Sequence, residues 1–219
     1  MRRIWNRLLA WMPFSASSGP AGASGPPGKL SLPMAPASPD APSHDLAQAL
    51  RAHREWIETG GKEGQRAEFA GKPLRMAILF MANLRGAGFR GADLRKAEVQ
   101  WADLTGADLA GADLTGADLF QSNLAGARLA GACLREAGLL SANAAGADFE
   151  GADLEGADLR GAVLRGARLA GAKLARADIR GADLSGARGL SPEQLAQARR
   201  DAETRLPAGL LPAAEGEEG

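Results

Sequence analysis

The sequence predicts an all-β solenoid, a rod of stacked parallel coils, over residues 67–186. A five-residue pattern runs through these 120 residues as 24 consecutive pentapeptides without an insertion. A large apolar residue occupies the centre of nearly every repeat, with alanine two residues earlier and, in most repeats, glycine two residues later. Aromatic residues make up 5% of the chain and tyrosine is absent, so small side chains must pack closely instead of filling a thick globular core.

The period of five excludes the simpler repeating structures. An α-helix advances about 100° per residue, so residues five apart share no face, and collagen needs glycine at every third position. In extended backbone the alanine and leucine, two residues apart, point the same way, while the residues beside leucine point outward. Glycine then permits the positive φ of a tight corner. Each pentapeptide therefore forms one short side and one corner.

The repeats Ala-Asp-Leu-Thr-Gly and Ala-Asp-Leu-Ala-Gly at residues 102–116, and Ala-Asp-Leu-Arg-Gly at 157–161, resemble the A(D/N)LXX signature of the pentapeptide-repeat family. The resemblance implies a right-handed quadrilateral parallel β-helix of about six coils, four pentapeptides each, with short α-helical caps at both ends. Two sets of residues give the twenty-residue coil independent support, because each falls in one column at that spacing: Asn83, Asn123, Asn143 and Phe69, Phe89, Phe149.

Two segments beside the repeats are predicted to be cap helices. Residues 43–61 begin with Ser43 as an N-cap and end at Gly60-Gly61, and their apolar stripe comprises Leu46, Leu50, His53, Trp56 and Ile57. Residues 187–203 contain a capping box, Ser191 with Gln194, and a helix is expected from Ser191 to about Glu203. Residues 204–219 are expected to form an acidic tail.

Residues 1–14 are predicted to form a basic amphipathic helix, joined to the rest by a Ser/Gly/Pro/Ala-rich linker over residues 15–42. The basic side carries Arg2, Arg3 and Arg7, and the apolar side includes Trp5, Leu8 and Trp11. Such a helix suits an anionic membrane surface or a protein partner. A signal peptide is the competing interpretation, but Asn6 and Arg7 interrupt its apolar core.

One side of the predicted solenoid carries apolar residues that point outward. Sorting by the twenty-residue coil gathers these candidate interaction residues: Ile78, Phe80, Met81, Trp101, Phe120 and Leu140. The same side continues as Arg160 and Arg180. An exposed apolar area of a few hundred Å² is typical of a binding surface. Intramolecular covering, a homodimer and docking of a separate protein are the three alternatives.

The sequence offers no catalytic, cofactor-binding or metal-binding candidates. Both histidines, His44 and His53, fall in the predicted cap helix, and Cys133 has no histidine near it in sequence. The resemblance implies that the aspartate column belongs to the turns and not to a cation site; it comprises Asp103, Asp108, Asp113 and Asp118. No glycine-rich phosphate loop is present.

The predicted function is a non-enzymatic protein-interaction scaffold, with residues 1–14 as a tether to a membrane surface. The composition indicates a bacterial source, and the predicted location is the cytoplasm or the periphery of the inner membrane. The resemblance also raises an alternative, a DNA mimic that binds a type II topoisomerase (gyrase), which requires a strongly acidic rod. Residues 67–186 carry 14 basic and 15 acidic side chains, which disfavours it. The whole chain has 26 of each, so direct binding of nucleic acid is not expected.

Overall fold

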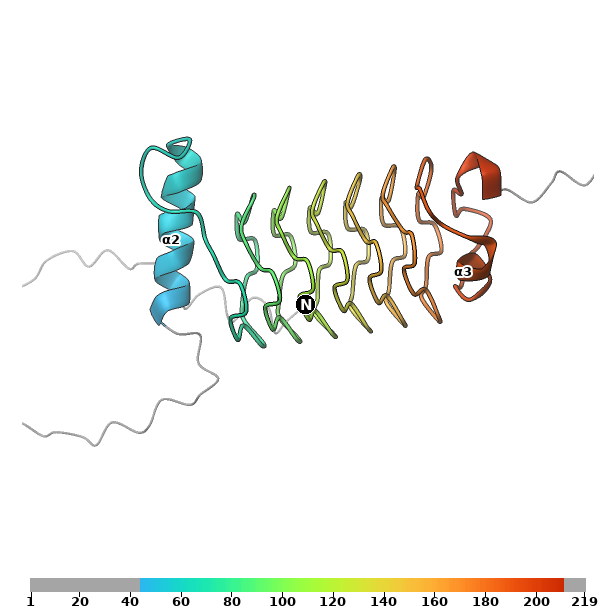
Figure 1. The fold of residues 1–219 in the computed structure, drawn as a ribbon, viewed down its shortest axis with the longest axis horizontal. Helices are drawn as coiled ribbons and strands as arrows, with labels where there is room; N and C mark the ends of the chain where they lie inside the picture. Colours follow the sequence, from blue (N-terminus) through green and yellow to red (C-terminus); the bar gives the residue numbers. More distant parts are fainter. Residues whose placement is uncertain (1–43, 211–219) are drawn as a thin grey trace, which may run out of the picture. The chain divides into compact units, whose positions relative to one another are not determined.

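The computed structural model describes residues 44–210, so the predicted helix over residues 1–14 and the linker over 15–42 lie outside the described residues. The elements are helix α2 (His44–Glu58), a stack of parallel coils, helix α3 (Pro192–Ala196) and the 3-10 helix η1 (Ala208–Leu210). Figure 1 shows the coils stacked one upon the next after α2 and before α3.

Each coil is twenty residues long. Isolated parallel bridges join a residue to the one twenty positions later, beginning with Glu68–Gly88 and continuing at every fifth residue to Arg168–Arg188. Each side of a coil thus contributes one bridged residue between two corners. The coil therefore contains four pentapeptides, as the columns of asparagine and phenylalanine predicted.

The backbone hydrogen bonds explain why five residues suffice for a side and a corner. In a typical repeat, Leu104 N donates to Asn123 O at 2.7 Å and Gly106 N donates to Ala125 O at 3.0 Å, both in the next coil. Ala107 N donates back to Leu104 O at 2.9 Å and closes the turn. Gly106 has a φ of 65°, which the third residue of a type II turn requires.

The interior consists of the central residue of each repeat, usually leucine, and the alanine that stands two residues before it in most repeats. Leu104, Leu109 and Leu114 are buried, as are the alanines at 107 and 112. Phe69 and Phe89 stack with ring centroids 5.1 Å apart. Burying a leucine side chain stabilises the fold by about 1.5–3 kcal/mol, so the leucine columns supply most of the driving force for folding. Ala144, the one small central residue, is also buried.

Helix α2 contacts the first coil through its buried side. Leu46 belongs to the core, and Ala49 and Leu50 pack against it. The turn after the helix folds back tightly, because Gln65 N donates to Ala52 O at 3.0 Å. A Cβ atom on Gly64 would lie 2.2 Å from Ala52 O, so only glycine fits there.

The C-terminal segment begins as the sequence predicts and then departs from it. Ser191 is the N-cap of α3, and the capping box with Gln194 is present. Gln194 Nε2 also donates to Leu169 O and Ala172 O, at 2.9 and 2.7 Å. The helix ends at Ala196, however, so the prediction of a helix to Glu203 is wrong.

The helix stops early because the last coil offers unpaired backbone groups. Ile179 N donates to Arg199 O at 2.8 Å, and Leu184 N donates to Arg205 O at 2.7 Å. Arg199 and Arg205 form parallel bridges with Asp178 and Asp183. Residues 199–205 therefore continue the stack, with a turn at residues 202–203 between the two bridged arginines. Residues 204–210 belong to the folded part and not to an acidic tail.

Candidate interaction face

The predicted interaction residues lie together on one side of the solenoid. We call Ile78, Phe80, Met81, Trp101, Phe120 and Leu140 the apolar strip. The ring of Trp101 packs edge-on between two phenylalanines, with centroids 5.2 Å from Phe80 and 5.1 Å from Phe120. Its Nε1 donates to Gln121 Oε1 at 2.7 Å, which holds the indole in place. The strip is therefore an ordered ladder of rings.

Half of the apolar strip is exposed to solvent, and the other half is partly buried. The exposed fractions are 67% for Met81, 48% for Ile78 and 41% for Trp101, whereas Phe80, Phe120 and Leu140 are half-buried. Met76, which sequence reasoning missed, is 59% exposed. It precedes Ile78 at a corner, and its place two residues after the inward Leu74 was the signal that could have identified it.

The two corners that bound this side differ from the other two. Eight non-glycine residues between 44 and 210 have a positive φ, and every one of them stands at these two corners. The first corner carries Met76, Lys96, Glu136 and Arg176, and the second carries Met81, Trp101, Gln121 and Ser141. The remaining two corners are glycine in every coil, from Gly71 and Gly86 to Gly171 and Gly186.

A side chain at such a corner is strained. The left-handed region costs a non-glycine residue about 1–2 kcal/mol, because Cβ crowds the following carbonyl. Glycine avoids this strain, and the other two corners show that a corner of this solenoid can be glycine in every coil. Strain of this kind concentrates where a side chain serves a function.

Beyond Leu140 the same side becomes ionic. Arg160 donates from Nε and Nη2 to Asp158 at 2.8 and 2.7 Å, and Arg180 donates in the same way to Asp178 at 2.8 and 2.6 Å. These hydrogen bonds are the main reason that the pKa values of both aspartates lie below the ordinary range. The two arginines are thus neutralised by their own repeats.

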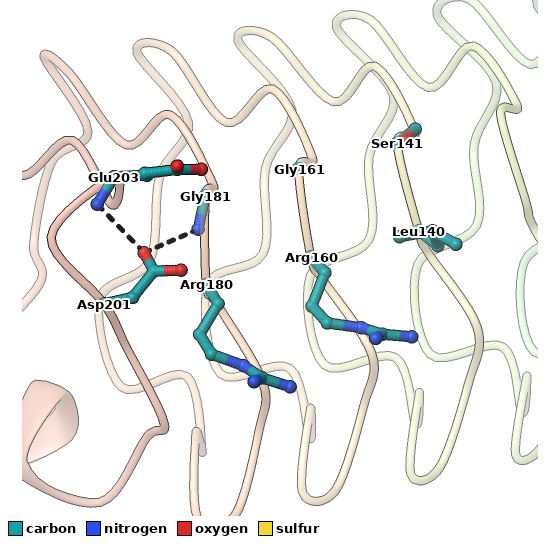
Figure 2. Close-up of a pocket in the computed structure, with 8 residues that line it drawn as sticks. All are labelled: Leu140, Ser141, Arg160, Gly161, Arg180, Gly181, Asp201 and Glu203. Carbon is teal, nitrogen blue, oxygen red and sulfur yellow. Dashed lines mark hydrogen bonds between the residues drawn. The ribbon is translucent and has the colours of Figure 1, made fainter.

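A shallow groove runs along this ionic part. Figure 2 shows it lined by Leu140, Ser141, Arg160, Gly161, Arg180, Gly181, Asp201 and Glu203. Asp201 accepts hydrogen bonds from Gly181 N at 2.9 Å and Glu203 N at 3.1 Å. The groove opens where the second corner returns to glycine, at Gly161 and Gly181, because these positions carry no side chain.

The repeats match a known family. The family model described as pentapeptide repeats matches in eight copies over residues 82–121, 122–161 and 152–188. HetL, a pentapeptide repeat protein involved in heterocyst differentiation regulation from the cyanobacterium Nostoc, is 33% identical over 64% of this chain and 70% of its own length, with a TM-score of 0.37. The chain belongs to the pentapeptide-repeat family.

Other solved pentapeptide-repeat structures show similarity. A pentapeptide repeat protein from the Arabidopsis thaliana thylakoid lumen is 37% identical over 45% of this chain and 66% of its own, with a TM-score of 0.34. QnrB1, a plasmid-mediated fluoroquinolone resistance protein, is 15% identical over 64% of this chain and 90% of its own, with a TM-score of 0.35. A comparison with curated proteins finds no match. Pentapeptide-repeat proteins are generally structural or interaction proteins and not enzymes.

The aspartates of this pentapeptide-repeat chain form part of its turns. Asp103 Oδ1 accepts from Thr105 N at 3.0 Å and from Thr105 Oγ1 at 2.5 Å, and the same contact recurs at Asp113 and at Asp183. This is the side-chain turn typical of aspartate. Within residues 44–210, no group of three or more His, Cys, Asp or Glu side chains is suited to a metal ion.

His53 has a structural place in α2. It is buried, its ring stacks on Trp56 with centroids 5.6 Å apart, and its Nδ1 accepts from Ala67 N at 3.1 Å. Its Nε2 has no hydrogen-bond partner among the described residues. Burial, and then Arg66, lower the pKa of His53, while Glu68 opposes them. The neutral imidazole therefore joins α2 to the first repeat.

Cys133 is half-buried in a column of outward residues, and its Sγ lies 3.2 Å from Thr115 Oγ1. The side chain of His44 lies outside the described part of the chain. Over residues 44–210, no helix is both long enough and apolar enough to span a bilayer.

Proposed function

We propose that this protein is a non-enzymatic protein-interaction scaffold whose binding surface is the side that carries the apolar strip. The observation that carries the proposal is the placement of all eight strained non-glycine corners around this one side. At about 1 kcal/mol each or more, they destabilise a fold that uses glycine freely elsewhere. Contacts with a partner outside the solenoid explain why side chains stand at these corners in spite of the strain.

The chemistry of the strip supports the same proposal. Aromatic residues and methionine are enriched at protein interfaces, and rings that are already ordered lose little conformational entropy on binding. Trp101 is fixed between Phe80 and Phe120 and by its hydrogen bond to Gln121. The strip therefore presents a rigid apolar anchor beside polar groups.

We propose further that the coils are right-handed and about six in number, and that the two terminal segments cap them. A solenoid exposes unpaired backbone at each end and needs a cover there. Supporting contacts are Ala67 N to His53 at one end, and Ile179 N to Arg199 O and Leu184 N to Arg205 O at the other.

A pull-down from a bacterial lysate with the intact chain tests the scaffold. The strip variant carries Phe80→Asp and Phe120→Asp. The matched control carries Ala110→Asp and Ala130→Asp, which occupy the same place in the repeat but half a coil away, on the opposite side. Proteins bound by the wild type and the control should be lost from the strip variant. Retention of the same proteins by all three would refute the proposed surface.

The location proposed is the bacterial cytoplasm at the periphery of the inner membrane, with residues 1–14 as the tether. The support is their sequence, three arginines opposite an apolar side that contains Trp5 and Trp11. Co-sedimentation with anionic liposomes should decrease when the three arginines become glutamate. It should persist in a control that reverses three exposed cations of the α2 region, Arg51, Arg54 and Lys62. Equal loss of liposome binding in the two variants would refute the proposed tether.

The DNA-mimic alternative receives no support from the charge distribution. Arginines stand beside aspartates of neighbouring coils, as in the pairs Arg128–Asp108 at 3.6 Å and Arg168–Asp148 at 3.3 Å. The faces therefore lack the continuous negative charge of duplex DNA. A gyrase supercoiling assay with micromolar protein should show neither inhibition nor protection.

A further inference from the structure

We infer that the partner of the apolar strip is a basic amphipathic helix of about ten to fifteen residues that lies along the strip. This inference rests on the proposed function, since it names the chemistry of the partner that the scaffold binds. Three features of the described residues lead to it: the spacing of the rings, the charges beside them and the groove at the far end.

The spacing of the strip matches a helix. Successive ring centroids are 5.2 and 5.1 Å apart, and neighbouring coils are about 4.8 Å apart along the stack. Both distances are close to the rise of about 5.4 Å per helical turn. One side of a helix can therefore place one apolar residue on each row. Like-facing residues of an extended strand recur only every ~6.6 Å or more, so a strand would fall out of register within the strip.

The length of the strip sets the length of the helix. The rows occupied by Phe80, Trp101, Phe120 and Leu140 belong to four successive coils. At the usual strand spacing of about 4.8 Å, the first and last rows lie ~14 Å apart. A helix covers that distance with about ten residues. A few more are needed to carry the flanking charges.

The charges beside the strip select a basic partner. On the strip's own side of these coils, counting its two corners and the residues beside the inward Leu79, Val99, Leu119 and Leu139, the charged side chains are Lys96, Glu98, Asp118 and Glu136, three carboxylates against one ammonium. Asp118 accepts from Gln100 Nε2 at 2.8 Å. Neither Asp118 nor Glu136 enters an ion pair with any residue between 44 and 210, although ion pairs are frequent elsewhere in the stack. These two carboxylates are available to arginine or lysine.

The groove in Figure 2 extends the same surface. Its glycine corner leaves room past Leu140 for the end of a docked helix. The exposed carboxylates of Asp201 and Glu203 stand at its far end. Arg160 and Arg180 are held by Asp158 and Asp178, so they add little net positive charge. A basic residue at the end of the helix finds a carboxylate there as well.

The chain carries a sequence of the required chemistry at residues 1–14, which provides the probe. A fluorescent peptide of that sequence is titrated into the full-length chain and followed by anisotropy. The chain carries Leu8→Asp and Leu9→Asp, so that its own copy of the sequence does not compete. We expect saturable binding, and at least tenfold weaker binding by a scrambled peptide whose apolar residues do not share one side.

Variants in the full-length chain locate the binding. Trp101→Gly should weaken binding at least tenfold without unfolding the coil, because glycine adopts the φ of 56° at this position freely. Asp118→Asn with Glu136→Gln should weaken it several-fold and reduce its dependence on salt. Ala130→Asp, half a coil away on the opposite side, should leave it unchanged.

Three results would overturn the inference. One is the absence of saturable binding up to about 1 mM peptide, a concentration at which a contact is too weak to specify a partner. Another is equal weakening by Trp101→Gly and Ala130→Asp. The third is a chain that sediments as a dimer and becomes a monomer on Trp101→Gly, which would assign the strip to a second copy. The proposed scaffold survives the first two results if Phe80→Asp with Phe120→Asp still removes proteins in the pull-down.

Discussion

Replacing Glu136 with glycine should stabilise the solenoid by about 0.5–1 kcal/mol. Glu136 is exposed, stands at a corner with a φ of 57° and enters no ion pair within the described residues. Its removal therefore changes mainly the backbone term. Relief of the left-handed strain contributes about 1–2 kcal/mol, and the larger unfolded-state entropy of glycine takes back about 0.5–1 kcal/mol.

The reverse substitution provides the matched control. Gly146 stands at an all-glycine corner with a φ of 67°, and a Cβ atom there would meet nothing within 4 Å. Gly146→Glu should therefore destabilise the fold by about the same 0.5–1 kcal/mol, from backbone strain alone. The double variant, which has the composition of the wild type, should return close to wild-type stability, because the two sites do not touch.

Urea unfolding followed by far-ultraviolet circular dichroism measures these differences, with equal m-values showing that the same structure unfolds. Thermal melts should move by about 1–4 °C for a chain of this size. If Glu136→Gly proves neutral or destabilising while Gly146→Glu destabilises, the Glu136 side chain itself supports the fold. The non-glycine corners would then be explained by stability and not by binding, and the proposed binding surface would lose its main support.

Three further predictions concern stability. Because burial lowers the pKa of His53 below its ordinary 6.5, the contribution of the neutral imidazole to stability is complete above pH 6.5 and decreases as the pH drops below that value. The melting temperature of the wild type should therefore decrease as the pH is lowered from about 8 to 5, whereas that of His53→Gln should not change, and equal slopes would refute this. Leu114→Ala should cost about 2.7–5 kcal/mol in urea unfolding, and a loss under about 1 kcal/mol would mean that the core closes around the gap. Hydrogen bonds from Ser185 and Arg165 lower the pKa of Asp183 to about 2, so the contribution of its carboxylate to stability is present above its ordinary pKa of 3.8 and is lost as the pH falls toward 2. Asp183→Asn should reduce the stability of the fold at neutral pH and should also reduce the further loss of stability in acid, and an unchanged midpoint of acid unfolding would contradict this.

The repeat fold could be predicted from the sequence because each position of the pentapeptide does one physical job. An inward leucine, an inward alanine and a corner glycine predict one side and one corner per pentapeptide, and Leu104 and Gly106 behave as that pattern requires. The closure of four such sides into one coil was implied by the family resemblance. The members of the apolar strip could be gathered for the same reason. Once the coil is twenty residues long, residues such as Phe80 and Phe120 must stand in one column.

The C-terminal segment shows which features could not be predicted from neighbouring residues in the sequence. The capping box at Ser191 correctly predicted the start of α3, since all its hydrogen bonds are formed by neighbours in sequence. The helix was expected to continue, yet Arg199 and Arg205 pair with the last coil. That competition depends on backbone groups far away in the chain, so helix propensity could not reveal it.

By itself, the sequence determined that each pentapeptide is one side and one corner and which side chains point inward, because those follow from the period and from which residues tolerate a corner. The four-sided coil, and with it the column of each side chain, was implied by the resemblance to the pentapeptide-repeat family, since a period of five does not fix how many sides close a coil. The tertiary structure alone decided that the non-glycine corners keep a positive φ, how Trp101 packs between two rings and which carboxylates stay outside ion pairs. Those features depend on φ angles and on contacts between coils twenty residues apart. No local pattern encodes them, since each is the joint result of the stack.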